Sequence, residues 1–300
     1  MDLTIKKKKI DASVDISRVM NADNYPPQKH ITRDLMVFLE FQGKERGTNR
    51  VPVVPQVCTD RGSMHVGVIV TLIDILGALL TARAVSPDWF ATSNLFVHTT
   101  GRAKSGVVAA NGSVMRAGRT AVVVEVDILE EGENSGPVTS IGMAMMTFSR
   151  LPRRKETLEF KVDDDSTEAF RFGIDGSGLT RHYLDEIGLN VLDEGAGVVE
   201  LDMSDYIRNS LHSINGGMVA TLADVAGQHA ARIATGKPLI TTDLEVHYIE
   251  QGKIGPFRTR ARVLRTTGET ALTRVEVIDT GADDRLITVA MNTATLDGKA

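Results

Sequence analysis

The longest apolar stretches of the chain lie in two segments whose spacing predicts helices. In the first, roughly 65–84, Val68, Leu72 and Ile75 recur at helical spacing and therefore share one face. The second covers roughly 216–234. Because helices this apolar must be covered on nearly all sides, we expect a sheet to wrap around each of them.

A series of β-rich runs follows each predicted helix. The runs lie near 92–100, 105–116, 119–130 and 138–149 after the first helix, and near 240–250, 256–266, 270–280 and 285–296 after the second. Hairpin turns are predicted at Gly118-Arg119 and Gly268-Glu269. One helix followed by sequential strands favours an antiparallel sheet with the helix packed on it, an α+β arrangement.

The two helix-and-strand units repeat one another. The segment VTLIDILGALL (70–80) matches ATLADVAGQHA (220–230), and TSNLFVH (92–98) pairs with TTDLEVH (241–247). Between the units the chain is polar and ends in glycines, which is typical of a connector. We therefore predict four parts, which are a polar N-terminal extension (1–30), unit one (31–150), a connector (151–179) and unit two (180–300).

Each predicted helix carries an aspartate in the middle of its apolar run, Asp74 in the first and Asp224 in the second. A buried carboxylate without a partner is costly. The residues one turn away are mostly small, so another backbone or a ligand can come close. Two interpretations remain open: an aspartate at a helix–helix seam, hydrogen-bonded by a threonine, or an acid kept for chemistry.

Two glycines, Gly216 and Gly217, open the second helix. A helix start has free N–H groups and partial positive charge, and glycine lets a substrate oxygen approach them, as in an oxyanion hole. Gly216 lies about 12 Å from Asp224 along one helix, too far for both to contact one carbonyl. We therefore expect the two helices to pack antiparallel, each offering its start to the middle of the other.

Composition excludes several classes of protein. The chain is 42% hydrophobic and 24% charged, which is a globular composition, and its net charge of −5 disfavours nucleic-acid binding. The basic run Lys6–Lys9 is predicted to be a solvated tail. Asp74 and Arg83 interrupt the stretch 66–85, so we expect no membrane span.

The chain has a single cysteine, Cys58, which rules out an internal disulfide framework and a zinc cluster built by cysteine spacing. One cysteine fits a reducing, cytoplasmic setting. Without metal-ligand spacing or a glycine-rich phosphate loop, we expect neither a metal nor a bound cofactor.

The motif around the acid resembles that of the hotdog-fold acyl-CoA thioesterases of the phenylacetic-acid-pathway and 4-hydroxybenzoyl-CoA type. Their motif is an asparagine, a His-Gly-Gly, and a Thr-Leu-Ala-Asp within the helix. This chain has Asn209, Asn215-Gly216-Gly217 and Thr221-Leu222-Ala223-Asp224. The resemblance covers about 35–150 and 180–296. It implies a double hotdog in one chain, with an antiparallel sheet around each helix and sites between the paired units.

The resemblance also implies a role for each motif position. The asparagine and first glycine of one unit hold the thioester and the water, the helix acid of the other unit is the nucleophile or general base, and a strand hydroxyl assists. Site one would combine Asn209 and Gly216 with Asp74 and either Thr92 or Ser93. Site two would combine Thr59 and Val66 with Asp224 and Thr242.

Unit one departs from the motif, because Thr59 and Val66 replace the asparagine and the first glycine. His65 keeps the motif histidine there, whereas unit two has Asn215. A valine retains its N–H but crowds the approach to it. We therefore expect site one to be complete and site two to contribute little.

The substrate implied by the resemblance is an acyl-CoA, with coenzyme A as part of the substrate. Gly217 and the alternating Arg258 and Arg260 are candidates for contacts with it, although alternating arginines also occur on a solvated strand face. His98 and His247 are expected to be ordinary surface or packing residues.

The leading hypothesis is hydrolysis of an acyl-CoA or related thioester, in lipid metabolism. The alternative is a non-catalytic acyl-CoA-binding module, because half of the motif is degraded. A hotdog dehydratase or hydratase would be expected to show a different histidine–aspartate pattern, which we do not find. The expected partner is a small molecule, and pairing of whole chains into a homo-oligomer is compatible with the sequence.

Overall fold

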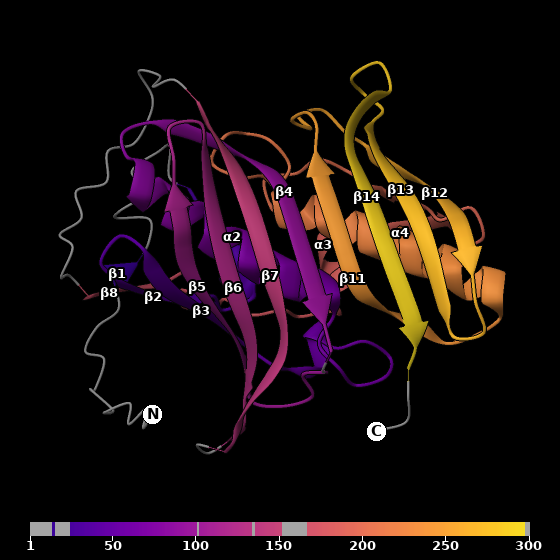
Figure 1. Cartoon of the computed structure of the whole chain (residues 1–300), viewed down its shortest axis with the longest axis horizontal. Helices are drawn as coiled ribbons and strands as arrows, with labels where there is room; N and C mark the ends of the chain where they lie inside the picture. Colours follow the sequence, from indigo (N-terminus) through magenta and orange to yellow (C-terminus); the bar gives the residue numbers. More distant parts are fainter. Residues whose placement is uncertain (1–13, 16–24, 101, 134–135, 152–166, 298–300) are drawn as a thin grey trace.

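The computed structural model describes residues 14–15, 25–100, 102–133, 136–151 and 167–297 of the chain. Two units lie side by side, and in each a long helix packs against a curved sheet (Figure 1). The predicted tail Lys6–Lys9 falls outside the described residues. The α+β class and the paired hotdog units are confirmed.

Unit one consists of one long helix, several short elements and a sheet. Its elements are β1 (Val14–Asp15), α1 (Ile31–Asp34), β2 (Phe38–Gln42), β3 (Arg46–Pro52), η2 (Pro55–Val57), α2 (Val66–Val85), β4 (Trp89–Thr99), β5 (Val107–Ala117), β6 (Ala121–Glu131), β7 (Val138–Leu151) and β8 (Thr167–Arg171). The four strands that follow α2 lie where the β-rich runs predicted them. The turn at Gly118 is closed by its N–H, which donates to the Ala121 carbonyl.

Unit two repeats this plan. Its elements are α3 (Tyr183–Ile187), β9 (Asn190–Asp193), β10 (Val198–Leu201), α4 (Gly216–Thr235), β11 (Leu239–Tyr248), β12 (Phe257–Thr266), β13 (Thr270–Asp279) and β14 (Arg285–Leu296). The side chain of Asn215 caps the start of α4 by accepting from the Gly217 N–H. At the other end, Gly236 takes a left-handed φ of 63° and ends the helix.

The two sheets join edge to edge into a single sheet of 14 strands, in the order β1-β8-β2-β3-β5-β6-β7-β4-β11-β14-β13-β12-β10-β9. The junction is an antiparallel pairing of β4 with β11, in which Leu95 lies opposite Val246. Side-chain contacts cross it, among them His98 Nδ1, which lies 2.7 Å from an Asp243 carboxylate oxygen, and His247 Nδ1, which lies 2.7 Å from Asn94 Oδ1. Both histidines therefore tie the two units together.

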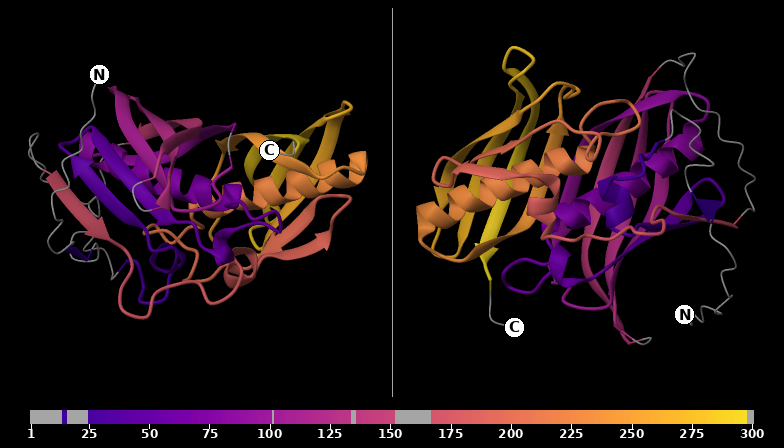
Figure 2. Two further views of the ribbon diagram at one scale, coloured as in Figure 1. Left: turned by 90° about the horizontal axis from the view of Figure 1, so that it is seen from below. Right: turned by 180° about the vertical axis from the view of Figure 1, so that it is seen from behind.

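Helices α2 and α4 pack antiparallel on the same side of this sheet, as the sequence predicted (Figure 2). Their contact depends on glycine. A Cβ added to Gly67 would lie 2.6 Å from Thr221 Oγ1, and one added to Gly217 would lie 2.5 Å from the Thr71 Cα. The two backbones therefore approach more closely than any larger residue allows.

The short helices α1 and α3 each reach across to the opposite unit. His30, which precedes α1, is fully buried and its Nε2 lies 2.9 Å from the Arg208 carbonyl oxygen. His182, which precedes α3, places its Nε2 2.5 Å from the Cys58 carbonyl oxygen. The last residue of the predicted N-terminal extension, His30, is thus hydrogen-bonded to unit two.

The predicted connector also contains structure. Residues 167–171 form β8, which lies between β1 and β2 in the sheet of unit one, and Phe170 is buried there. Residues 152–166 lie outside the described part of the chain. The polar composition concealed this strand because a strand of five residues has few inward-facing positions.

Helix α2 is the one helix among the described residues that is long and apolar enough to cross a membrane, with a mean hydropathy of 2.0 over its most apolar window. Of that window, 83% is buried inside the protein. The burial matches the core helix that the sequence predicted.

We expect unit two (180–300), expressed alone, to be insoluble or to pair with a second copy. Separation from unit one exposes both the β11 edge and the apolar seam of α4. Size-exclusion chromatography with light scattering checks this, with the full chain as the control. A soluble, well-folded monomer of this half contradicts the prediction.

Gly217→Ala is expected to destabilise the protein by about 1–3 kcal/mol, because the added methyl group meets the Thr71 backbone and forces α2 and α4 apart. Urea denaturation of the full chain measures this. Gly268→Ala is the matched control, since a Cβ at Gly268 meets nothing within 4 Å. Equal urea concentrations at the unfolding midpoint of the two variants contradict the prediction.

Candidate active site

Asp74 points from the middle of α2 toward the start of α4. Its carboxylate oxygen Oδ2 accepts the Gly217 N–H at 3.2 Å, and the residue is 6% exposed. A Cβ added to Gly216 would lie 2.8 Å from the same oxygen. The structure thus brings the acid of unit one against the two glycines of unit two. This is the pairing we expected, because the acid of unit two lies too far along the same helix to reach those glycines.

Burial raises the pKa of Asp74 from 3.8 to about 6, although the Gly217 N–H and the Thr92 hydroxyl act in the opposite direction by hydrogen bonding to the carboxylate. Its Oδ1 atom is buried and has no hydrogen-bond partner among the described residues. No hydrogen bond within the described residues occupies the lone pairs of Oδ1. The same is true of Oδ2 of the other helix acid, Asp224. A carboxylate with a pKa near 6 is ionised at neutral pH and more basic than an ordinary aspartate.

Of the two hydroxyl candidates on β4, Thr92 is the one beside Asp74. Ser93 Oγ lies instead 2.6 Å from Ser149 Oγ on the neighbouring strand β7. The pairing of β4 with β7 shifts register between Thr92 and Asn94. The structure therefore places Thr92, and not Ser93, beside Asp74, and the assisting role of either hydroxyl stays a prediction.

Asn209 shapes the turn that precedes α4. Its Oδ1 accepts the Leu211 N–H at 2.9 Å and the Ser213 N–H at 3.1 Å, and its Nδ2 lies 3.5 Å from the Ile214 carbonyl oxygen. Within the described residues it makes no hydrogen bond to Asp74. Its expected part in orienting water or substrate stays a prediction.

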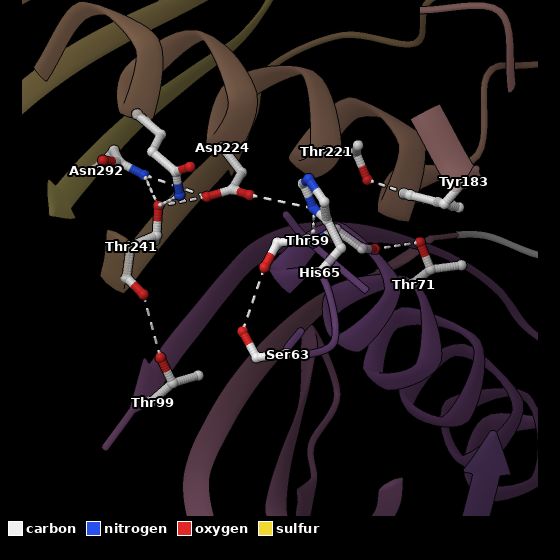
Figure 3. Close-up of polar contacts among 12 residues, drawn as sticks. Thr59, Ser63, His65, Thr71, Thr99, Tyr183, Thr221, Asp224, Thr241 and Asn292 are labelled. Atoms are coloured by element: carbon white, nitrogen blue, oxygen red, sulfur yellow. Dashed lines mark hydrogen bonds and ion pairs between the residues drawn. The ribbon is translucent and has the colours of Figure 1, made fainter. Parts of the chain in front are cut away.

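Asp224, in the middle of α4, lies in a closed polar cluster (Figure 3). The Thr241 hydroxyl donates to Asp224 Oδ1 at 2.5 Å, and Asn292 Nδ2 donates to that hydroxyl at 2.9 Å. Gln228 Nε2 also reaches the Thr241 oxygen, at 3.4 Å. Asp224 is 1% exposed, and burial raises its pKa to about 6.

His65 of unit one faces the other oxygen of this acid, with its Nδ1 3.8 Å from Asp224 Oδ2. Burial lowers the pKa of His65 to about 4, so the imidazole is neutral at pH 7. The same Nδ1 accepts the Gly67 N–H at 3.3 Å. The ring therefore caps α2, as Asn215 caps α4.

The hydroxyl beside Asp224 belongs to Thr241 and not to the predicted Thr242. The Thr242 hydroxyl donates to Asp243 at 3.0 Å and to the Thr293 carbonyl at 3.3 Å. Thr241 and Thr92 occupy equivalent positions in the TTDLEVH and TSNLFVH repeats. Strict use of that repeat could have identified Thr241.

The two acids differ in the residues that cover them. In unit one, Met146 lies opposite Leu95, whereas in unit two Asn292 lies opposite the equivalent Leu244. Along the helix, Gln228 of α4 replaces Ala78 of α2. Unit two therefore has two amide side chains where unit one has apolar ones, and Asn292 and Gln228 are site residues that the sequence analysis missed.

Arg258 and Arg260 lie on the outer face of the sheet. Both are exposed, whereas Phe257 and Thr259, which alternate with them, are fully buried. The two guanidinium groups therefore face away from α4 and from Asp74, and Arg258 pairs with Glu200 at 2.6 Å. Gly217 uses its N–H on Asp74 and Asn215.

The described part of the chain holds no cluster of three or more histidine, cysteine, aspartate or glutamate side chains that could bind a metal ion. The groups near Asp74 instead include the Gly217 N–H, the Thr92 hydroxyl and the phenols of Tyr25 and Tyr248. Such a set can stabilise negative charge on an oxygen and can move a proton.

Solved structures resemble the whole double unit. The tesB protein of Mycobacterium avium subs paratuberculosis has a TM-score of 0.58 at 12% identity, covering 86% of this chain and 96% of its own. An acyl-ACP thioesterase from Bacteroides thetaiotaomicron has a TM-score of 0.53 at 11% identity, covering 83% and 97%. At these identities the likeness shows the fold. Comparison with curated protein sequences gives no match.

A sequence model of the thioesterase superfamily matches this chain twice, over residues 61–136 and 211–284. Each match contains one long helix with its aspartate and the first three strands that follow it. The two matched regions together make up half of the chain, and the chain belongs to the thioesterase superfamily.

Proposed function

We propose that the chain hydrolyses an acyl-CoA or related thioester at Asp74, between the two units. The observation that carries the proposal is the buried Asp74 carboxylate, which lies against the start of α4 and keeps Oδ1 without a hydrogen-bond partner among the described residues. Membership of the thioesterase superfamily supports thioester hydrolysis in general.

The start of α4 activates the thioester carbonyl as the electrophile. The thioester carbonyl oxygen lies at the Gly216 N–H, where the partial positive charge of the helix end stabilises the developing oxyanion. Only glycine leaves room there, because a Cβ at Gly216 would meet the Asp74 carboxylate.

Asp74 supplies the nucleophilic half. Its Oδ1 takes a proton from water as the water oxygen bonds to the carbonyl carbon, and collapse of the intermediate breaks the C–S bond and returns that proton to the leaving thiolate. Alternatively, Oδ1 attacks the carbonyl carbon directly, and water then hydrolyses the acyl-aspartyl anhydride. Both routes yield one carboxylic acid and one thiol, and Thr92 orients the carboxylate in both.

Asp224 has no comparable access to a substrate. Val66 stands at the position that corresponds to Gly216, and the amides of Asn292 and Gln228 fill the neighbourhood of the acid. The polar contacts of Asp224 therefore tie α4 to β11 and β14. We propose that this acid is structural and that the chain has one active site.

Asp74→Asn is expected to lower kcat by about 100-fold or more, because the amide can act neither as a base nor as a nucleophile. Thiol release from a panel of short, long and aromatic acyl-CoA substrates measures this. Asp224→Asn is the matched control and is expected to retain most of the activity.

Thermal melts show whether both variants fold. Loss of turnover in Asp224→Asn with near-normal Asp74→Asn would reverse the assignment of the two acids. Binding of acyl-CoA without thiol release by the unaltered chain would contradict hydrolysis and favour a binding module.

The kcat is expected to rise with pH through about pH 6 and then level off. Asp74 must be ionised to act, and burial raises its pKa from 3.8 to about 6, so its active form is lost as the pH falls below that value. Stopped-flow thiol release between pH 4.5 and pH 8 measures the profile. An acid limb near pH 4, where an ordinary aspartate titrates, contradicts the assigned environment.

A further inference from the structure

Tyr248 contacts the same short stretch of backbone that holds Asp74. It is the last residue of β11, and its hydroxyl donates to the Gly216 carbonyl oxygen at 2.9 Å. The side chain is half-buried and packs against the hydrophobic core. Burial and the nearby Asp74 carboxylate raise the pKa of Tyr248 well above 10, so the phenol stays protonated and remains a donor.

The Gly216 carbonyl and the Gly217 N–H belong to one planar peptide group. Tyr248 holds the oxygen end of this group, and its nitrogen end donates both to Asn215 Oδ1 at 2.9 Å and to Asp74 Oδ2 at 3.2 Å. Fixing the carbonyl therefore fixes the direction in which the N–H points. A glycine on each side of the peptide makes such a tie effective, because glycine restrains its backbone less than any other residue.

We propose that Tyr248 is a positioning residue for Asp74, acting through the 216–217 peptide. The inference rests on the proposed function only for its effect on turnover. The phenol directs the N–H to Oδ2, which leaves Oδ1 oriented toward the reactant. Donation to the carbonyl also polarises the peptide and strengthens the N–H as a donor to the carboxylate.

The other site lacks this arrangement. The residue equivalent to Tyr248 in unit one is Thr99, and its hydroxyl lies 3.4 and 3.3 Å from the carbonyl oxygens of Thr241 and Thr242 on β11. The peptide equivalent to 216–217 joins Val66 to Gly67, and the Gly67 N–H donates to His65 and not to an acid. The tie through a phenol is thus found at the acid that faces two glycines.

Tyr248→Phe tests the inference because it removes the hydroxyl and keeps the ring. Loss of one hydrogen bond is expected to lower kcat about 3- to 10-fold at pH 7 with little change in KM. The weaker N–H donor leaves the Asp74 anion less stabilised, so the acid limb of the pH profile moves to higher pH by about 0.5. A purely structural role for Tyr248 would lower the melting temperature without moving that limb.

The matched control is Tyr206→Phe. This phenol also makes one hydrogen bond, donating to Asp34 Oδ2 at 2.9 Å, and it lies in the loop before α4. We expect its pH profile to match that of the unaltered chain. An unmoved limb in Tyr248→Phe, or an equal movement in Tyr206→Phe, overturns the inference.

The pKa of Asp74 can be measured without turnover, and this measurement tests the inference separately from the proposed function. The Asp74 carboxyl is titrated by carbon-13 NMR of aspartate-labelled protein, with Asp74→Asn identifying its resonance. A higher midpoint in Tyr248→Phe supports the positioning role even if no thioester is hydrolysed, in which case only the proposed function fails. An unchanged midpoint with active unaltered protein overturns the inference alone.

Discussion

The contact between α2 and α4 sets the geometry of everything that lies between the units. Two glycine–threonine pairs related by the internal repeat, Gly67 with Thr221 and Gly217 with Thr71, bring the helix backbones together. Each threonine hydroxyl donates to a carbonyl of its own helix, at 2.7 and 2.8 Å, so the seam satisfies its hydroxyls without water. At this separation the start of one helix reaches the acid of the other.

The close approach of α2 and α4 places two carboxylates in a poorly solvated region, and the two carboxylates have different surroundings. Asp224 Oδ1 accepts from a hydroxyl and an amide of its own unit, whereas its Oδ2 faces His65 of unit one and has no hydrogen-bond partner among the described residues. Asp74 has one backbone N–H and one hydroxyl, and one of its oxygens lacks a partner among the described residues. The two acids therefore differ in what faces them, which is the glycine start of the opposite helix at Asp74 and a histidine at Asp224.

Much of this architecture could be predicted because it is encoded locally. Helical periodicity and hairpin turns located α2, α4 and the eight strands that follow them. The contact between Asp74 and the glycines followed from helix rise, since no single helix can bring both to one atom. The strand β8 was missed because its five residues carry little of the alternation that marks a buried strand.

The amide side chains near Asp224 could not be predicted, and the reason differs from that for β8. Asn292 lies 68 residues further along the chain, and only the sheet order brings it to Asp224. The same holds for Tyr248, whose position on β11 says nothing about which peptide its hydroxyl reaches. In β4, a shift of register decides that Thr92 and not Ser93 faces the acid. These details depend on which strands and helices pair in the folded protein, and adjacent residues in the sequence do not reveal that pairing.

The two units joined at β4 and β11 belong to one chain, so their residues can be substituted independently in evolution. In a dimer of identical chains every substitution occurs twice, so both interfaces gain or lose a feature together. Here the two halves are joined in one polypeptide, and each position exists once. Val66, Asn292 and Gln228 could therefore accumulate on one side while the other kept its glycine and its phenol. A chain that carries both halves can therefore surround Asp224 with amides while the surroundings of Asp74 stay different.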